Sequence, residues 1–134
     1  MYTSETKIRV RYSETDKMKY VYYGNYATYY EVGRVEALRQ LGISYKSLEE
    51  NGIMMPVLEN HSKFIKAAVY DDLLTIKVSI PMLPSVRISF NYDIYNEENT
   101  LLHKGETTLA FVDINTGRPC RPPEEMLQLL KPFY

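Results

Sequence analysis

Hydrophobic and polar residues alternate near the start of the chain. Apolar residues at positions 8, 10 and 12 are separated by basic residues at positions 7, 9 and 11. A period of two predicts a strand with one buried face. The polar run 13–17 breaks the alternation, so we expect a loop there.

The pattern then changes to a helical period over residues 22–41. One stripe at helical spacing holds apolar or small residues: Tyr26, Tyr30, Gly33, Ala37 and Leu41. We expect Asn25 to be the N-cap and Gly42 to stop the helix. The charged residues do not gather on one face, which indicates burial on several sides. Gly33, unfavourable in mid-helix, indicates a close approach to a neighbouring backbone.

The rest of the chain predicts strands almost to its end. Strands are expected at 53–69, 74–80, 86–94 and 100–114, with a helical turn at 47–50 and a short helix at 124–130. One long helix followed by antiparallel strands favours an α+β layered fold. A sheet of about five strands can cover only part of such a helix, so we expect a homo-oligomer.

Composition sets further limits. The 134 residues suit a single domain, 1–134, and a net charge of −1 gives no field that would attract nucleic acid or an anionic membrane. No apolar run is long enough for a transmembrane helix, and the N-terminus does not resemble a secretory signal, so a cytoplasmic location is expected. Cys120 is the only cysteine, which excludes an intrachain disulfide.

Most familiar catalytic motifs are missing. The chain has no phosphate-binding loop, no dinucleotide fingerprint and no nucleophile elbow. His61 and His103 lie far apart and lack a suitably spaced acidic or cysteine partner, so we interpret them as structural or surface residues, not metal ligands. We interpret the Cys120 thiol, between prolines, as incidental.

Asp16 lies in the loop before the predicted helix. A helix N-terminus offers unpaired N–H groups and the positive end of the helix dipole. A carboxylate beside such donors can serve acyl transfer to water, because one group acts on the carbonyl while the donors hold the developing oxyanion. These residues alone also allow a simple loop-capping aspartate.

Residues 11–36 carry a long motif. Its positions are filled without a gap by Tyr12, Glu14, Thr15, Asp16, Met18, Val21, Tyr22, Asn25, Tyr26, Glu31, Arg34 and Glu36. This segment resembles the 4-hydroxybenzoyl-CoA thioesterase family of the hotdog superfamily, especially its branch associated with the Tol-Pal cluster. The run from Tyr70 to Leu73 and the tail after Thr116 are similar to the family more loosely, so the resemblance spans essentially the whole chain.

The resemblance implies a single hotdog domain, with an antiparallel five-to-six-stranded sheet wrapped around one long central helix. It implies a homo-oligomer, either a dimer or a dimer of dimers (a homotetramer), with sites at the subunit interface. The implied reaction is hydrolysis of an acyl-CoA thioester to a carboxylic acid and free CoA. Neither a metal nor an organic cofactor is implied.

The family's functional residues fall on particular positions of this chain. Its catalytic carboxylate corresponds to Asp16, and the backbone N–H that polarises the thioester carbonyl corresponds to Tyr23. Asn25 takes the position of a family Asn or Ser. Tyr12 corresponds to an aromatic residue that lines the pocket. Glu31 is our second choice for the carboxylate, although a helix pair with Arg34 is the expectation for it.

Two departures from the family pattern change the expectations. Lys19 stands where the family usually has glycine, and lysine does not adopt a positive φ cheaply, so we expect an altered loop or an added charge near the site. Tyr23 stands where the branch often has histidine. The oxyanion role survives because it belongs to the backbone, but the substrate of the histidine branch need not carry over.

Substrate contacts are expected from aromatic and basic residues. Tyr22 and Tyr26, from the tyrosine-rich stretch 20–30, are expected to line the acyl pocket. The phosphates of CoA call for cations, for which the candidates are Lys63, Lys66, Arg87, Arg118 and Arg121. Alternatives to an acyl-CoA thioesterase are a non-catalytic acyl-CoA-binding hotdog protein and a thioesterase for acyl carrier protein. A hotdog dehydratase is less favoured, because neither histidine lies near the motif.

Overall fold

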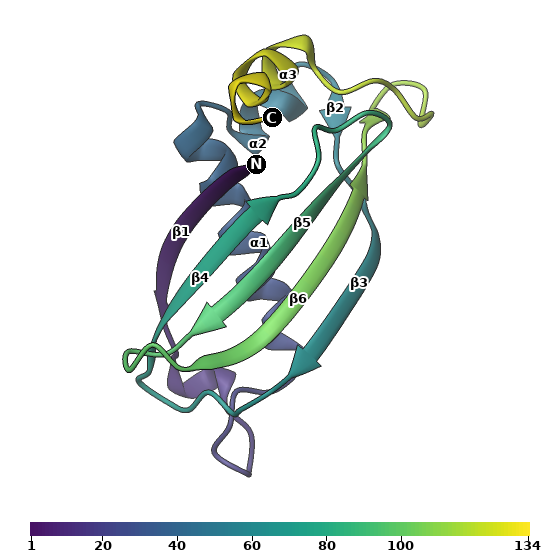
Figure 1. Cartoon of the computed structure of the whole chain (residues 1–134). Helices are drawn as coiled ribbons and strands as arrows, with labels where there is room; N and C mark the ends of the chain where they lie inside the picture. The colour runs from purple at the N-terminus through teal and green to yellow at the C-terminus, as the bar shows by residue number, and fades with distance from the viewer.

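The computed structural model describes all residues, 1–134, and consists of one curved sheet wrapped against one helix (Figure 1). The sheet contains β1 (Tyr2–Arg9), β4 (Leu73–Ile80), β5 (Arg87–Tyr95), β6 (Leu101–Ala110) and β3 (Val57–Phe64), in that order, and every neighbouring pair is antiparallel. Helix α1 (Asn25–Leu41) crosses its inner face. This is the α+β hotdog arrangement predicted from the sequence, with five strands in the main sheet.

Smaller elements gather at one end. They are α2 (Tyr45–Glu50), α3 (Glu124–Leu130), the pair β2 (Ile53–Met54) and β7 (Val112–Asp113), and the second of two short 3-10 helices, Lys131–Phe133, the first being Tyr12–Glu14. The first 3-10 helix and the chain up to α1 lie at the opposite end (Figure 1). The two ends of α1 therefore have different surroundings.

Alternation in the central strands produces the core. The inward residues of β4 and β5 are almost completely buried: Leu74, Ile76, Val78, Ile80, Ile88, Phe90, Tyr92 and Ile94. Helix α1 rests on them at Gly33, where a Cβ atom would lie 3.0 Å from methyl groups of Ile76 and Val78. The close approach predicted at Gly33 is therefore confirmed, although the glycine meets side chains and not backbone.

The first strand differs from its prediction. It runs from Tyr2 to Arg9, and Tyr12 belongs to a 3-10 helix instead of the strand. The early part of this strand was not predicted, because some of its inward-facing residues are polar. Ser4 faces inward and its hydroxyl donates to Gln40 Oε1 at 2.9 Å, while the Tyr2 hydroxyl donates to the Ala37 carbonyl at 2.6 Å.

The helix also begins later than predicted. Gly24 is the N-cap, and Asn25 is the first helical residue, so the N-cap prediction for Asn25 was wrong. The Asn25 amide instead donates to the Glu14 carbonyl at 2.8 Å. The predicted stop is confirmed, since Gly42 has a left-handed φ of 111° and its N–H closes the last turn.

Two predicted long strands are each divided. Pro56 lies between β2 and β3, where the segment 53–69 was expected to be continuous. The segment 100–114 bends at Phe111, so that β6 stays in the main sheet and β7 pairs with β2. The helix predicted at 124–130 is confirmed.

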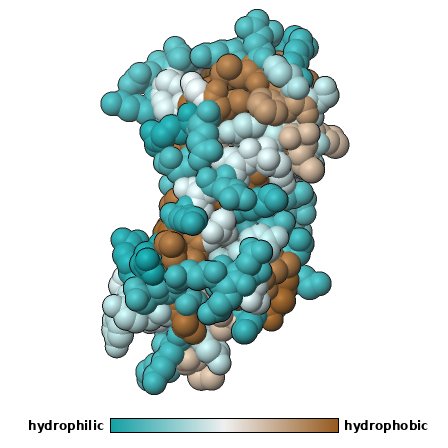
Figure 2. Space-filling view, turned by 60° about the vertical axis from the view of Figure 1, so that its left-hand side comes forward, coloured by the Kyte–Doolittle hydropathy of each residue, from teal (hydrophilic) through white to brown (hydrophobic).

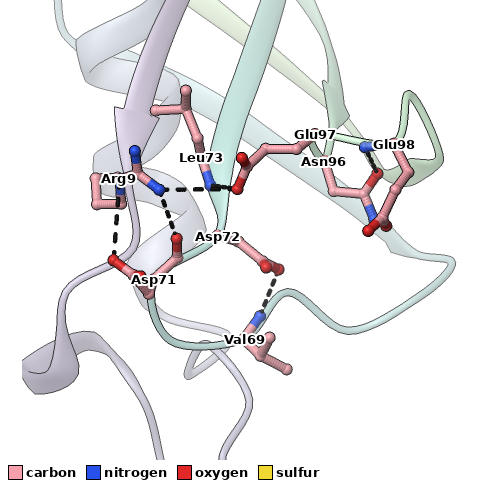
Figure 3. Close-up of polar contacts among 8 residues, drawn as sticks. All are labelled: Arg9, Val69, Asp71, Asp72, Leu73, Asn96, Glu97 and Glu98. Atoms are coloured by element: carbon pink, nitrogen blue, oxygen red, sulfur yellow. Dashed lines mark hydrogen bonds and ion pairs between the residues drawn. The ribbon is translucent and has the colours of Figure 1, made fainter.

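A polar cluster ties three segments together at one end of the sheet (Figure 3). Arg9 donates to the Asp71 carbonyl at 2.8 Å, and its guanidinium lies 3.7 Å from Glu97. Glu97 also accepts a hydrogen bond from the Leu73 backbone N–H at 3.0 Å. Exposed ion pairs of this kind contribute little stability. Their effect is to hold the turn, in which Asp71 has a positive φ of 70°.

Hydrophobic side chains also reach the surface. Figure 2 shows them as separate patches interrupted by hydrophilic residues, so this face presents no continuous apolar surface. The edge strand β3 differs from the rest of the sheet, because every one of its residues is exposed. No helix has the length and apolar character needed to cross a membrane.

Candidate active site

A hollow of about 260 Å³ opens beside the N-terminal end of α1. Its walls come from the loop before α1, the first turn of α1, and the end of β3 with the residues after it. The lining residues are Asp16, Tyr20, Val21, Tyr23, Tyr26, Phe64, Ile65, Lys66 and Ala67. Most are hydrophobic, so Asp16 and Lys66 are the charged groups in an apolar setting.

The loop holds Asp16 in one orientation. Its Oδ1 atom accepts hydrogen bonds from the N–H of Met18 at 2.8 Å and of Tyr20 at 3.4 Å. Its backbone bonds with Tyr20 and with Lys19 close the turn. The Oδ2 atom has no partner in the chain and is left available for a ligand or water.

Lys19 corrects one expectation. It adopts a positive φ of 68°, the conformation that the family's glycine takes easily. Our expectation that lysine would avoid this conformation was wrong. The strain, about 1–2 kcal/mol for a residue with a Cβ, is offset by the turn bonds around Asp16.

The backbone at Tyr23 is open at the start of α1. Tyr23 lines the hollow, and its N–H donates to no acceptor within the chain. The first bonds of the helical turn are made by later residues, Asn25 to the Tyr22 carbonyl and Tyr26 to the Tyr23 carbonyl. A free donor at the positive end of a helix is suited to hold a negatively charged oxygen.

Glu14 connects the Asp16 loop to α1. Its buried carboxylate accepts bonds from the Arg11 guanidinium at 2.8 Å and from the Tyr29 hydroxyl at 2.9 Å. Its backbone carbonyl accepts from Tyr22 and from the Asn25 amide. Burial alone would raise the pKa of Glu14, but the hydrogen bonds from Arg11 and Tyr29 outweigh it and hold that pKa below its ordinary 4.5.

Replacing Glu14 with alanine should damage both stability and activity. The Tyr29 hydroxyl would lose its acceptor while buried, at a cost of about 1–3 kcal/mol. The loop would also lose its anchor, and misplacement of Asp16 should lower kcat/KM by roughly tenfold or more. Urea unfolding and thioesterase assays measure the two effects. Glu14→Gln, which keeps an acceptor for Tyr29, should recover most of both, and an unchanged Glu14→Ala variant would contradict the role.

The other aromatic and amide residues predicted for the site differ in where they lie. Tyr26 is buried and lines the hollow. Tyr12 and Tyr22 are exposed outside its lining, where Tyr12 packs edge-on against Tyr70 and Tyr22 packs against Tyr23. Asn25 points at Glu14, away from the hollow, so in this chain it positions the loop.

The structure separates the basic candidates. Lys66 lines the hollow. Lys63 instead lines a polar depression of about 450 Å³ on the outer face of the sheet. Arg87 starts β5 and is not among the residues that line the hollow. Arg118 follows β7, at the end of the molecule that holds α2 and α3 (Figure 1).

His103 is a residue whose position the sequence did not reveal. It is completely buried on β6, its ring stacks on Tyr26 at 4.0 Å, and its Nε2 atom bonds to the Tyr30 hydroxyl. The Tyr30 hydroxyl also contacts Ser62 Oγ at 2.7 Å. Burial lowers the pKa of His103 to about 4, and its Nδ1 atom has no partner. The structural interpretation of His103 fits this position, while His61 is exposed.

Glu31 and Arg34 do not form the expected ion pair. Arg34 turns inward and donates to the Tyr45 hydroxyl at 3.2 Å, whereas the corresponding helix pair forms between Glu36 and Arg39 at 3.1 Å. No group of three His, Cys, Asp or Glu side chains is arranged to hold a metal ion.

The fold and this hollow define a class: a hotdog protein in which a carboxylate and the residues before the central helix line one apolar hollow. Comparison with known proteins agrees. Residues 10–130 match the model of the thioesterase-like superfamily. The chain belongs to that superfamily and is a thioester hydrolase.

Individual relatives narrow the comparison. The chain is 31% identical over 119 residues to the putative acyl-CoA thioesterase YneP of Bacillus subtilis, covering 89% of this chain and 86% of YneP. It is 30% identical to the chloroplastic acyl-acyl carrier protein thioesterase ATL3 of Arabidopsis thaliana, covering 91% of this chain and 64% of ATL3. The solved DHNA-CoA thioesterase of Staphylococcus aureus superposes with a TM-score of 0.87 at 36% identity, covering 90% of this chain and 81% of that one.

Proposed function

We propose that this protein hydrolyses acyl-CoA thioesters, with Asp16 as its catalytic carboxylate. One observation carries the proposal: Asp16 and the free N–H of Tyr23 line the same apolar hollow. Hydrolysis of a thioester needs both a group that acts on the carbonyl carbon and a donor for the oxygen. The acyl-CoA thioesterase name of YneP supports CoA as the carrier.

In the proposed mechanism the thioester carbonyl oxygen accepts a hydrogen bond from Tyr23 N–H. The free Oδ2 of Asp16 then either takes a proton from the attacking water or attacks the carbonyl carbon itself and forms an anhydride. A water molecule that opens the anhydride would complete the second route. The products in both cases are the carboxylic acid and free CoA thiol.

Release of free thiol from short, medium, long and aromatic acyl-CoAs tests the proposal. Hydrolysis of at least one substrate is expected. Binding without any hydrolysis would overturn the proposal in favour of a non-catalytic acyl-CoA-binding protein. Single turnover in heavy-oxygen water tests the anhydride route, because label enters the Asp16 carboxylate only if that carboxylate attacks and water then opens the anhydride at the Asp16 carbonyl.

We also propose that two copies pair through β3. This edge strand is exposed along its whole length and includes the apolar residues Val57, Leu58 and Phe64. Unpaired N–H and C=O groups on such an edge favour pairing with another strand. A second copy related by a two-fold axis would pair β3 with β3 and cover the hollow beside α1.

Light scattering should therefore give about twice the mass of one chain. Val57→Lys should weaken the dimer, because it would place a charge on the strand edge that pairs with the second copy. Met82→Lys is the matched control, since Met82 is an exposed apolar residue in the loop after β4. A monomeric wild type, or equal effects of the two lysines, would contradict pairing through β3.

An acyl carrier protein is the second candidate substrate carrier. Lys17, Lys19 and Lys66 lie on the loop of Asp16 or in the hollow itself, and a carrier protein is acidic. The similarity to ATL3 adds support. Thiol release from a CoA thioester and a carrier-protein thioester of the same acyl group decides between them. Faster hydrolysis of the carrier-protein thioester that is lost at high salt would favour the carrier protein, because salt screens the attraction between these lysines and an acidic carrier.

A further inference from the structure

A second, separate hollow lies between α1 and β3. It has a volume of about 200 Å³ and lies one to two helical turns beyond the candidate active site. Its lining residues are Ala27, Thr28, Tyr30, Glu31, Arg34, Val57, Asn60 and Thr107. The active-site hollow is mostly aromatic and aliphatic, whereas this one is mostly polar. An acyl chain that reaches from the first hollow to the second would pass the contact between Tyr30 and Ser62, and would move from an apolar wall to a polar one.

Arg34 is the unusual residue of this hollow. It is only 8% exposed, yet no carboxylate lies within ion-pairing distance of its guanidinium. Its Nε atom donates a hydrogen bond to the neutral Tyr45 hydroxyl at 3.2 Å. Burial would lower the pKa of Arg34, but the adjacent hydroxyls of Tyr92 and Tyr45 raise it, so the group stays charged. A buried charge without a counter-ion is costly.

We propose that Arg34 recognises a carboxylate at the far end of the acyl group, so that the preferred substrates are ω-carboxyacyl thioesters. This rests on the proposed thioesterase function. A guanidinium binds a carboxylate through two parallel N–H bonds, and burial strengthens them. Thr28 and Asn60 supply further donors in the same hollow. Glu31 also lines it, but its side chain is exposed and forms no ion pair with Arg34.

The spacing fits a medium-length chain. A rise of 1.5 Å per residue places Arg34 about 16 Å along the axis from Tyr23, and helical side chains lean back by about one turn. Roughly 10 Å then separates the guanidinium from the carbonyl held at Tyr23. A saturated eight-carbon acyl group is about as long as that gap and would bring a terminal carboxylate to Arg34.

The test compares octanoyl-CoA, ω-hydroxyoctanoyl-CoA and suberyl-CoA. These three share a chain length and end in a methyl group, a hydroxyl and a carboxylate. For the wild type, kcat/KM should be roughly 10- to 100-fold higher for suberyl-CoA than for octanoyl-CoA. In Arg34→Met the preference should vanish or reverse, while octanoyl-CoA hydrolysis persists. Arg39→Met, an exposed arginine on the same helix that pairs with Glu36, should keep the wild-type preference.

Other outcomes overturn the assignment. Equal hydrolysis of all three substrates, or an equal gain for the hydroxyl substrate, would show that no carboxylate site exists. The assignment would also be contradicted if Arg34→Met kept the preference for suberyl-CoA, or if its only effect were to dissociate the dimer. If Arg34→Met does not fold, Arg34→Lys decides, because losing the planar fork should reduce the preference severalfold. Absence of hydrolysis for every substrate would instead overturn the thioesterase proposal itself.

Discussion

Asp16→Asn should lower kcat by about a thousandfold or more, with little change in KM. Each tenfold loss corresponds to about 1.4 kcal/mol of transition-state stabilisation, so the effect is about 4 kcal/mol. The substitution is nearly isosteric. The asparagine oxygen can still accept from Met18 N–H and Tyr20 N–H, so the loop should keep its shape while the group loses its basicity and its nucleophilicity.

A neighbouring carboxylate gives the control. Asp72 accepts a bond from the Val69 N–H at 3.0 Å and lies outside the hollow's lining (Figure 3). Asp72→Asn should keep most of the wild-type kcat. Measurement of kcat and KM for both variants on the best acyl-CoA separates chemistry from binding. If Asp16→Asn retained near wild-type turnover, Glu31 would be the next carboxylate to test.

Local patterns were sufficient wherever neighbouring residues determine the structure. The alternation of β4 and β5, the stop at Gly42 and the helix at 124–130 were all readable, because each depends on residues close in sequence. The location of Asp16 in the loop before α1 was readable in the same way, while its catalytic role stays a proposal. The sequence motif and the structure therefore both place Asp16 before the N-terminal end of α1.

Contacts between distant residues explain the errors. Ser4 was not recognised as an inward residue, because its partner Gln40 is on α1. Arg34 was expected to pair with Glu31 on the helix surface, but it turns toward Tyr45, whose position depends on how α2 folds back. No single segment of sequence contains such information.

Tyr30 and Gly105 show the same limit. The two residues belong to α1 and β6, and a Cβ atom at position 105 would overlap the Tyr30 hydroxyl. The glycine therefore makes room for the tyrosine, which in turn reaches His103 and Ser62. His103 stacks on Tyr26, which lines the hollow, so this wall of the candidate active site depends on residues far apart in the chain.

Acid should destabilise the protein through His103. Burial lowers its pKa from 6.5 to about 4, so the folded protein keeps the ring neutral over a range in which the unfolded chain binds a proton. The stability contributed by the neutral ring is complete above pH 6.5 and is lost as pH falls toward 4. At 1.36 kcal/mol per pKa unit, the loss across that window is about 3 kcal/mol.

Urea unfolding at several pH values between 6.5 and 4.5 measures this loss. The lower limit matters, because the pKa of Glu14 is held below 4.5 and its contribution is lost only in more acidic solution. His103→Phe should flatten the pH dependence, since a phenyl ring can keep the stacking on Tyr26 and the contact with Phe64 without binding a proton.

The exposed His61 supplies the matched control, and His61→Gln should keep the wild-type slope. If His103→Phe lost stability with pH as steeply as the wild type, the acid sensitivity would have to come from another group.

The variant also tests the link between His103 and the candidate active site. Because the ring supports Tyr26 from below, a folded His103→Phe protein should keep its kcat near neutral pH, while the wild type should lose activity first as the solution becomes acidic.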